Sequence, residues 1–177
     1  MIRPLPGRIE TPRLTLRPVT PDDRAAVVDG IGNLEVSRWL AVVPYPYGPS
    51  DFDAWAATPD AMPGRTWMID EAGEVRGAVA LDAALGYWLA RPAWGRGLAS
   101  EAVAAVLDAR FRRRRSPVLA TVFDGNARSA ALVDRLGFVA TAPVVRTSTA
   151  LAQEVTATEY VLTRDRWHAF AGARRSA

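Results

Sequence analysis

The chain has 177 residues, 49% of them hydrophobic, and a formal net charge of +3. This length suffices for one full hydrophobic core and little more, so we expect a single domain over residues 1–177, with its core at about 10–167. No apolar run approaches the roughly eighteen residues of a membrane span, and residues 1–7 lack the apolar segment of a signal peptide, so a cytoplasmic protein is expected. The small net charge does not require a nucleic-acid partner.

Three residue types that are rare or missing narrow the chemistry. The chain has no cysteine, which excludes disulfides, a thiolate nucleophile and Cys-based metal sites. His168 is the only histidine, so one chain cannot form a Ser-His-Asp triad or a multi-His metal site, and no metal is expected. The chain also has no lysine, since all 22 residues of the Lys and Arg types are arginine, so arginines and main-chain N–H groups are left to bind phosphate. This usage suggests a GC-rich bacterial genome.

The first third of the chain predicts one strand and three short helices. A strand is expected at about 14–19. Thr20, followed by proline and two aspartates, is typical of a helix N-cap, and this helix should end at about Asp29. Asn33 and Ser50 are expected to cap two further helices, on either side of a loop rich in proline and tyrosine.

The next segment predicts three neighbouring strands. Residues 66–70 and 75–81 are expected to form a hairpin, and a third strand at 85–90 follows after a very short connection.

That third strand leads through a glycine turn directly into an amphipathic helix. Gly95 and Gly97 have no Cβ to hold the main chain away from a ligand, so consecutive N–H groups can converge on an anion at the positive end of the helix. Taken alone, this Gly-x-Gly pattern is equally typical of a tight turn that binds nothing. The buried face of the helix is predicted from 3.6-residue spacing: Ala99, Ala102, Val103, Val106, Leu107 and Phe111.

A second strand-to-helix unit follows. Its strand is predicted at Val118–Phe123, and its helix should begin at Asn126 and end with Gly137 in left-handed geometry. Two long strands at about 138–146 and 154–162 complete the chain. This order predicts a mixed sheet with helices on both faces. The run Arg112–Arg115 fits a solvated helix C-terminus better than an RNA-binding patch, because no aromatic residues lie between the arginines.

These two units resemble the cofactor motifs of the GNAT superfamily of acyl-CoA-dependent N-acetyltransferases, and within it the RimJ/RimL-like group. The likeness lies in Gly86-Tyr87-Trp88 followed by Trp94-Gly95-Arg96-Gly97-Leu98-Ala99-Ser100-Glu101-Ala102, and in Asn126-x-x-Ser129 with Arg135-Leu136-Gly137-Phe138. Residues 10–18 resemble the first strand of the family, and residues 160–167 its last strand and tail. The resemblance implies an α/β fold whose central, mostly antiparallel sheet contains one splayed pair of parallel strands.

The resemblance also implies acetyl-CoA as co-substrate. Its pantetheine arm would lie between the splayed strands 85–90 and 118–123, paired with main-chain groups of about Trp88 and Ala90, and Asn126 would bond this arm. Its diphosphate would rest on the amides of residues 95–99, with Arg96 as an added cation. The full set of expected cofactor-binding residues is Trp88, Leu89, Ala90, Trp94, Gly95, Arg96, Gly97, Leu98, Ala99, Ser100, Asn126 and Ser129.

The expected catalytic residues are Ser129, Asp82 and Glu154. Val133 occupies the position at which many GNAT enzymes have a tyrosine that protonates the leaving thiolate, and Ser129, one turn earlier, matches a serine of the RimJ/RimL-like group. Ser129 could equally be a small packing residue at a crowded helix start. Ala84 replaces a glutamate that often serves as general base, which leaves Asp82 and Glu154 as carboxylates near the expected site, or deprotonation through water.

The acceptor is expected to be a primary amine of a peptide or a small molecule, and nothing in the chain selects between them. It would enter between the early helices and the last strand pair, a region rich in aromatic residues: Trp39, Tyr45, Tyr47, Trp55 and Trp88. A homodimer is left open. Two alternatives to an enzyme remain: a catalytically silent acyl-CoA-binding module, and a protein that binds RNA through Arg112–Arg115.

Overall fold

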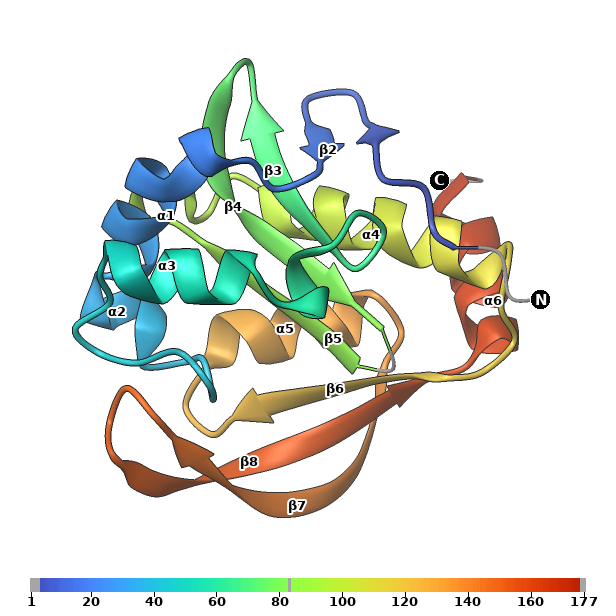
Figure 1. Ribbon diagram of the computed structural model, residues 1–177. Coiled ribbons are helices and arrows are strands. Elements are labelled where there is room, and N and C mark those ends of the chain that lie inside the picture. Colours follow the sequence, from blue (N-terminus) through green and yellow to red (C-terminus); the bar gives the residue numbers. More distant parts are fainter. Residues whose placement is uncertain (1–3, 83, 176–177) are drawn as a thin grey trace.

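The computed structural model describes residues 4–82 and 84–175, and a single eight-stranded sheet forms its centre (Figure 1). The strand order is β1-β2-β3-β4-β5-β6-β8-β7, and only the β5–β6 pair is parallel. The strands are β1 (Ile9–Glu10), β2 (Thr15–Arg17), β3 (Thr66–Glu71), β4 (Glu74–Leu81), β5 (Ala84–Leu89), β6 (Val118–Phe123), β7 (Val139–Ser148) and β8 (Gln153–Leu162).

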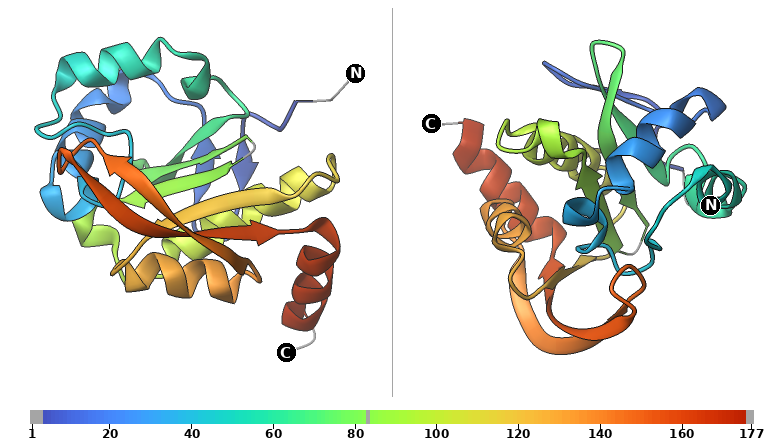
Figure 2. Two further views of the ribbon diagram at one scale, coloured as in Figure 1. Left: turned by 90° about the horizontal axis from the view of Figure 1, so that it is seen from below. Right: turned by 90° about the vertical axis from the view of Figure 1, so that its left-hand side faces the viewer.

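The helices lie on both faces of this sheet, as the right-hand view of Figure 2 shows. They are α1 (Arg24–Ile31), α2 (Leu34–Ser37), α3 (Pro49–Ala56), α4 (Leu98–Phe111), α5 (Ala127–Arg135) and α6 (Arg164–Arg175), with the 3-10 turns η1 (Pro21–Asp23), η2 (Pro59–Ala61) and η3 (Arg91–Ala93). The predicted mixed sheet covered by helices on both faces is therefore confirmed.

Two hydrophobic clusters hold these layers together. The larger cluster joins α4, α5 and Trp167 of α6 to one face of the sheet, where Leu98, Val106 and Phe111 of α4 are fully buried. The smaller one joins α1 and α3 to the other face through Val27 and Phe52. Successive side chains of β5 point to opposite faces of the sheet, so Tyr87 packs against the larger cluster and Trp88 against the smaller one.

Several element boundaries differ from those expected. The helix α3 begins at Pro49 with Gly48 as its N-cap, and Asp51 rather than Ser50 bonds back to the Gly48 N–H at 2.8 Å. The helix α1 continues through Gly30, whose missing Cβ leaves room for the Trp88 ring of β5. The strand expected at about 14–19 is the shorter β2, which pairs with the preceding β1 as a hairpin, and the expected C-terminal tail contains α6.

Candidate active site

The parallel strands β5 and β6 separate toward their C-terminal ends and leave a gap in the sheet. Ala84 pairs with Leu119 and Leu85 with Ala120, but no pairing between the two strands continues beyond these residues in the described chain. Both strands nevertheless run on, β5 to Leu89 and β6 to Phe123. Main-chain groups on the facing edges therefore lack a strand partner and are available to an extended ligand.

The register of β5 shows which residues face this gap. The Ala90 N–H donates to the Arg76 carbonyl at 2.8 Å, so Ala90 and, two residues earlier, Trp88 turn their main-chain groups toward β4. A Cβ on Gly77 of β4 would lie only 2.0 Å from the Trp88 carbonyl oxygen, which agrees with this direction. Tyr87 and Leu89 face the gap instead, one residue away from the expected Trp88 and Ala90.

The loop before α4 presents a row of free main-chain donors. Gly95 and Gly97 adopt φ values of 75° and 77°, a left-handed backbone conformation that residues with a Cβ rarely adopt. In the part of the chain that the structure describes, the N–H groups of residues 95–100 donate no hydrogen bond, and α4 has no side-chain cap. The first helical bond runs from Glu101 N to Gly97 O at 3.1 Å. This arrangement suits an anion at the positive end of a helix.

Glu101 and Arg13 hold this loop in place. Glu101, in the first turn of α4, accepts hydrogen bonds from the Thr11 hydroxyl at 2.6 Å and the Arg13 main-chain N–H at 3.0 Å, and its Oε2 pairs with Arg13 Nε at 2.6 Å. Arg13 Nη1 also donates to the Arg96 carbonyl at 2.9 Å. Burial alone would raise the pKa of Glu101, but the donors from Thr11 and Arg13 lower it overall, so Glu101 remains charged at neutral pH.

Arg96, expected as a cation for the diphosphate, is already paired. Its two terminal nitrogens bind the two carboxylate oxygens of Glu71 at 2.9 and 2.7 Å, and Arg76 shares Glu71. The fork geometry of arginine favours such a bidentate pair. The hydrogen bond from Arg96 is the largest of several effects that hold the pKa of Glu71 below its usual value.

Trp94 connects the end of β5 with the start of α5. Its indole N–H donates to the Leu89 carbonyl at 2.8 Å, which leaves the Leu89 N–H as the free group of that residue on the gap. The guanidinium carbons of Arg91 and Arg128 lie 4.7 and 4.4 Å from the centre of the Trp94 ring. Of the remaining expected residues on this loop, Leu98 is fully buried in the core, and Ala99 and Ser100 are half-buried.

The start of α5 carries Asn126 and Ser129. The Asn126 carboxamide oxygen accepts the Ser129 N–H at 3.2 Å, so Asn126 is the N-cap that the sequence predicts. The Ser129 Oγ lies 2.7 Å from the Tyr87 hydroxyl oxygen, a hydrogen bond between α5 and β5. Val133 is fully buried.

Tyr87 is a side chain of the site that was not among the residues expected from the sequence. Burial raises the pKa of the Tyr87 phenol, and the hydrogen bond with Ser129 and the charge of Arg135 oppose this effect only in part, so the phenol stays protonated at neutral pH. The position of Tyr87 within Gly86-Tyr87-Trp88 was the only sequence pattern that could have indicated its role.

In the described part of the chain, neither Asp82 nor Glu154 forms a hydrogen bond with Ser129. Asp82 precedes β5 at the end of the sheet where β5 and β6 still pair, and its carboxylate is exposed, 3.6 Å from Arg65 and from Arg114. Glu154 lies beyond the opposite end of β6, the end that leads into α5, since Ala157 pairs with Phe123 and Glu154 is three residues before Ala157 in β8. The two carboxylates thus lie at opposite ends of the central strands.

The aromatic residues expected near the acceptor divide into two groups. Tyr47, Trp55 and Trp88 pack against the smaller hydrophobic cluster, and burial raises the pKa of Tyr47 to about 12. Tyr45 is exposed, and the half-buried Trp39 faces Gly125 in the turn between β6 and α5, 3.8 Å from the position of a Cβ there.

The turn between β7 and β8 is tied to the loop that follows α2. Thr149 donates from both its N–H and its hydroxyl to the Ala41 carbonyl, each at 2.9 Å. These contacts hold the loop of Trp39 against the last strand pair, the region through which the acceptor is expected to enter.

Within residues 4–82 and 84–175, no cluster of three or more His, Asp or Glu side chains could hold a metal ion. No helix in this part of the chain is long and apolar enough to cross a membrane.

Comparison with known proteins identifies the fold. Solved structures that resemble the chain include a GNAT-family acetyltransferase from Bacillus anthracis (16% identity, TM-score 0.77, covering 89% of this chain and 99% of the other). The chain is also similar to Mycobacterium smegmatis RimJ in complex with CoA-disulfide (21% identity, TM-score 0.70, covering 97% of this chain and 92% of the other). A third similar structure is a ribosomal-protein-alanine N-acetyltransferase from Brucella melitensis (18% identity, TM-score 0.67, covering 84% of this chain and 98% of the other). No curated protein matches the chain.

The family model described as the acetyltransferase (GNAT) domain matches residues 13–139, a range that contains the gap between β5 and β6, the Gly95–Gly97 loop and the start of α5. The chain therefore belongs to the GNAT acetyltransferase family.

Proposed function

We propose that the protein transfers an acetyl group from acetyl-CoA to a primary amine of a peptide N-terminus or a small molecule, by direct attack within a ternary complex. The observation that carries this proposal is the row of free N–H groups at residues 95–100, which lies at the open end of the gap between β5 and β6. Membership in the GNAT family and similarity to RimJ bound to CoA-disulfide support it.

The residues present fit acetyl-CoA. The amides of the Gly95–Gly97 loop and the first turn of α4 would bind the diphosphate, whereas the main-chain groups of Tyr87 and the Leu89 N–H would pair with the pantetheine amides. Asn126, held in place as the N-cap of α5, would contact the same arm. Arg96 would reach the diphosphate only by giving up part of its pair with Glu71.

Acetyl-CoA supplies a thioester that the amine attacks: a carbon–nitrogen bond forms, the carbon–sulfur bond breaks, and one amine proton balances the charge on the sulfur. The residues of the chain would orient the reactants and stabilise the developing charge. Ser129 is proposed to assist the departure of the thiolate. Asp82 and Glu154 would contribute to deprotonation of the amine through water.

The similarity to RimJ and to a ribosomal-protein-alanine N-acetyltransferase favours placement in the RimJ/RimL-like group, with a peptide N-terminus as acceptor. A catalytically silent acyl-CoA-binding module is the second candidate, because Asp82 lies at the end of β6 away from α5 and neither Asp82 nor Glu154 forms a hydrogen bond with Ser129 in the described chain. Binding of acetyl-CoA without release of free thiol in the presence of amines would favour that candidate.

The proposal is tested by substituting Gly97 and a matched control glycine. Gly73, in the β3–β4 turn, has a φ of 89° and nothing within 4 Å of an added Cβ, so Gly73→Val and Gly97→Val carry similar backbone strain. We expect Gly97→Val to raise the Kd for acetyl-CoA at least about tenfold, roughly 1.4 kcal/mol, and Gly73→Val to leave it within about twofold. Isothermal titration calorimetry measures both.

Gly95→Ala is the second test variant, in case Gly97→Val folds poorly, because the space beside Gly95 is also open. Folded Gly97→Val and Gly95→Ala proteins that bind acetyl-CoA as tightly as the wild type would contradict the proposed site.

A further inference from the structure

The hydrogen bond between Tyr87 and Ser129 links the two elements that border the gap. We infer that Tyr87 is a positioning residue that fixes the Ser129 hydroxyl so that its O–H can donate a hydrogen bond to the leaving sulfur of the acyl donor. This inference rests on the proposed function, which it deepens by assigning a role to a residue outside the expected catalytic set.

The two hydroxyl groups of Tyr87 and Ser129 have one proton more than their mutual hydrogen bond uses. Two hydroxyl groups carry two protons, and the 2.7 Å contact between the Tyr87 and Ser129 oxygens uses one of them. A phenol is a far stronger acid than an aliphatic alcohol, so Tyr87 is the better donor and Ser129 the better acceptor. The Ser129 proton then remains for a third group.

The Ser129 hydroxyl is held in position from two sides. Its residue is anchored through the N–H bond to Asn126 at 3.2 Å, and its Oγ through Tyr87 at 2.7 Å. Tyr87 is itself fixed, since its ring packs against the main hydrophobic cluster and its main chain forms the facing edge of the gap. A hydrogen bond received from Tyr87 also polarises the Ser129 O–H and strengthens it as a donor.

Tyr87 does not itself supply a proton to the sulfur. Burial raises its pKa above the usual value of about 10, whereas a thiol has a pKa near 8.5, so transfer from the phenol to a thiolate would be uphill by more than about thirtyfold. Ser129 is a weaker acid still. Both residues therefore keep their protons. When the carbon–sulfur bond breaks, its electron pair goes to sulfur, Ser129 donates a hydrogen bond to it, and the proton released by the amine reaches sulfur through water.

The test compares Tyr87→Phe, Ser129→Ala and their double variant, with Tyr160→Phe as matched control. Tyr160 is a half-buried tyrosine whose hydroxyl makes no hydrogen bond among the described residues. The main readout is the pKa of the thiol of bound CoA. It is measured by titration, with the ultraviolet absorbance of the thiolate recorded against a CoA-free reference.

We expect wild-type protein and Tyr160→Phe to lower the pKa of the bound thiol relative to free CoA. Tyr87→Phe and Ser129→Ala should each raise it again by at least about half a unit, and the double variant should resemble Ser129→Ala, because the two residues act as one unit. With any accepted amine, Tyr87→Phe should lower kcat about fivefold while KM for acetyl-CoA stays within about twofold.

A second readout needs no cofactor. Removal of the Ser129 hydroxyl should raise the pKa of Tyr87, measured by NMR of 13C-labelled tyrosine, because the tyrosinate loses a hydrogen-bond donor.

Three results would overturn the inference while leaving the proposed function intact: an unchanged thiol pKa in Tyr87→Phe, additive effects in the double variant, or an unchanged Tyr87 pKa in Ser129→Ala. Failure of CoA to bind the wild-type protein would instead overturn the proposed function and this inference with it.

Discussion

Arg110 places a positive charge in the interior near the end of α4. Its side chain is 2% exposed, and Nη2 donates to the Ser116 hydroxyl at 2.8 Å, but Nε and Nη1 have no partner among the described residues. Burial, with the nearby charge of Arg114, lowers the pKa of Arg110. A buried cation without a carboxylate partner costs free energy.

We therefore expect Arg110→Met to raise the free energy of unfolding by about 1 kcal/mol. Methionine keeps most of the aliphatic length of the side chain and removes the unpartnered donors. Urea unfolding measures the change, with exposed Arg113→Met as control, for which we expect a change within about 0.5 kcal/mol. A loss of more than about 1 kcal/mol in Arg110→Met would show that Arg110 is stabilising.

The position of Asp82 and Glu154 leads to a prediction about pH dependence. Since neither carboxylate forms a hydrogen bond with Ser129 among the described residues, the rising limb of kcat/KM should follow the pKa of the acceptor amine, and an acceptor of lower pKa should shift it to lower pH. Rate measurements with two amines of different pKa provide the test. A limb that stays fixed for both amines and disappears in Asp82→Asn or Glu154→Gln would identify a dedicated base.

At this scale the sequence predicts local geometry better than contacts. Asn126 as N-cap and Gly137 in left-handed geometry are confirmed, because each depends on residues close in the chain. The bond between Tyr87 and Ser129 joins residues 42 positions apart, and the pair of Arg96 with Glu71 joins residues 25 positions apart. No local pattern contains such contacts, so Arg96 was expected to be free.

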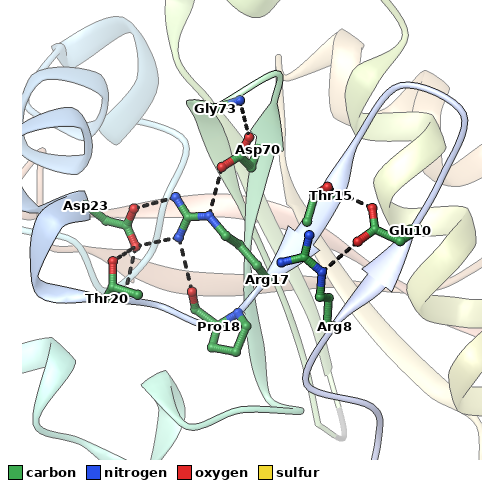
Figure 3. A network of polar contacts seen from close by, with 9 residues as sticks. All are labelled: Arg8, Glu10, Thr15, Arg17, Pro18, Thr20, Asp23, Asp70 and Gly73. Atoms are coloured by element: carbon green, nitrogen blue, oxygen red, sulfur yellow. Dashed lines mark hydrogen bonds and ion pairs between the residues drawn. The ribbon is translucent and has the colours of Figure 1, made fainter.

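Among the elements, a buried ion network joins β2, η1 and β3 (Figure 3). Arg17 binds both carboxylate oxygens of Asp23, at 2.7 and 3.0 Å, and Asp70 at 2.8 Å, while Asp23 also accepts the Thr20 N–H at 2.8 Å. Asp23 is 3% exposed. Burial alone would raise its pKa, but the hydrogen bonds from Arg17 and Thr20 lower the pKa below its value in the unfolded chain.

A carboxylate whose pKa is lower in the folded state stabilises the protein at pH values above its pKa in the unfolded chain, which is near 3.9 for aspartate. This contribution is lost as the pH falls through the pKa of the folded state. We expect Asp23→Asn to lower the free energy of unfolding at pH 7 by about 2 kcal/mol and to flatten its decline below about pH 5. Urea unfolding across pH 2–7 measures both effects.

The matched control is Asp53→Asn, because Asp53 forms an exposed pair with Arg24 at 3.1 Å. Such surface pairs contribute about 0–1 kcal/mol, so this variant should keep the acid dependence of the wild type. An unchanged acid limb in Asp23→Asn would contradict the role given to the network.

The sequence predicted those elements whose periodicity and end residues agree. The strand β6 has the predicted bounds Val118–Phe123, since a mostly apolar run is bounded by Pro117 and by Asp124-Gly125. The start of α3 was misplaced because Gly48 provides the cap geometry, with Asp51 closing it three residues later. The helix α6 was missed because Trp167 and Phe170 are its only large apolar residues, too few to show a helical period.

For the whole molecule, the sheet separates two surfaces of different character. The face covered by α4 and α5 carries the Gly95–Gly97 loop and its free N–H groups, whereas the other face carries α1, α3 and the Trp39 loop that is tied to the turn between β7 and β8 (Figures 1 and 2). We expect the acyl donor to bind from the first side and the amine from the second, so that they meet in the gap between β5 and β6.

The mixed sheet could be predicted from the order of strands and helices, because a β-α-β unit followed by a hairpin permits few arrangements. The length over which β5 and β6 stay paired could not, since their apolar residues are compatible with a longer ladder. The acceptor could not be predicted from the sequence either, because the loops expected to form its entrance come from distant parts of the chain and meet at Ala41 and Thr149.

The most direct test of acetyl transfer is release of free thiol from acetyl-CoA by the purified wild-type protein, measured with and without a panel of peptide N-termini and small amines, with mass spectrometry of the amine products. We predict amine-dependent thiol release that matches, mole for mole, the appearance of acetylated amine, and its loss in Gly97→Val but not in Gly73→Val. Thiol release that no amine accelerates, from a protein that binds acetyl-CoA tightly, would contradict the proposed transferase and leave an acyl-CoA-binding module.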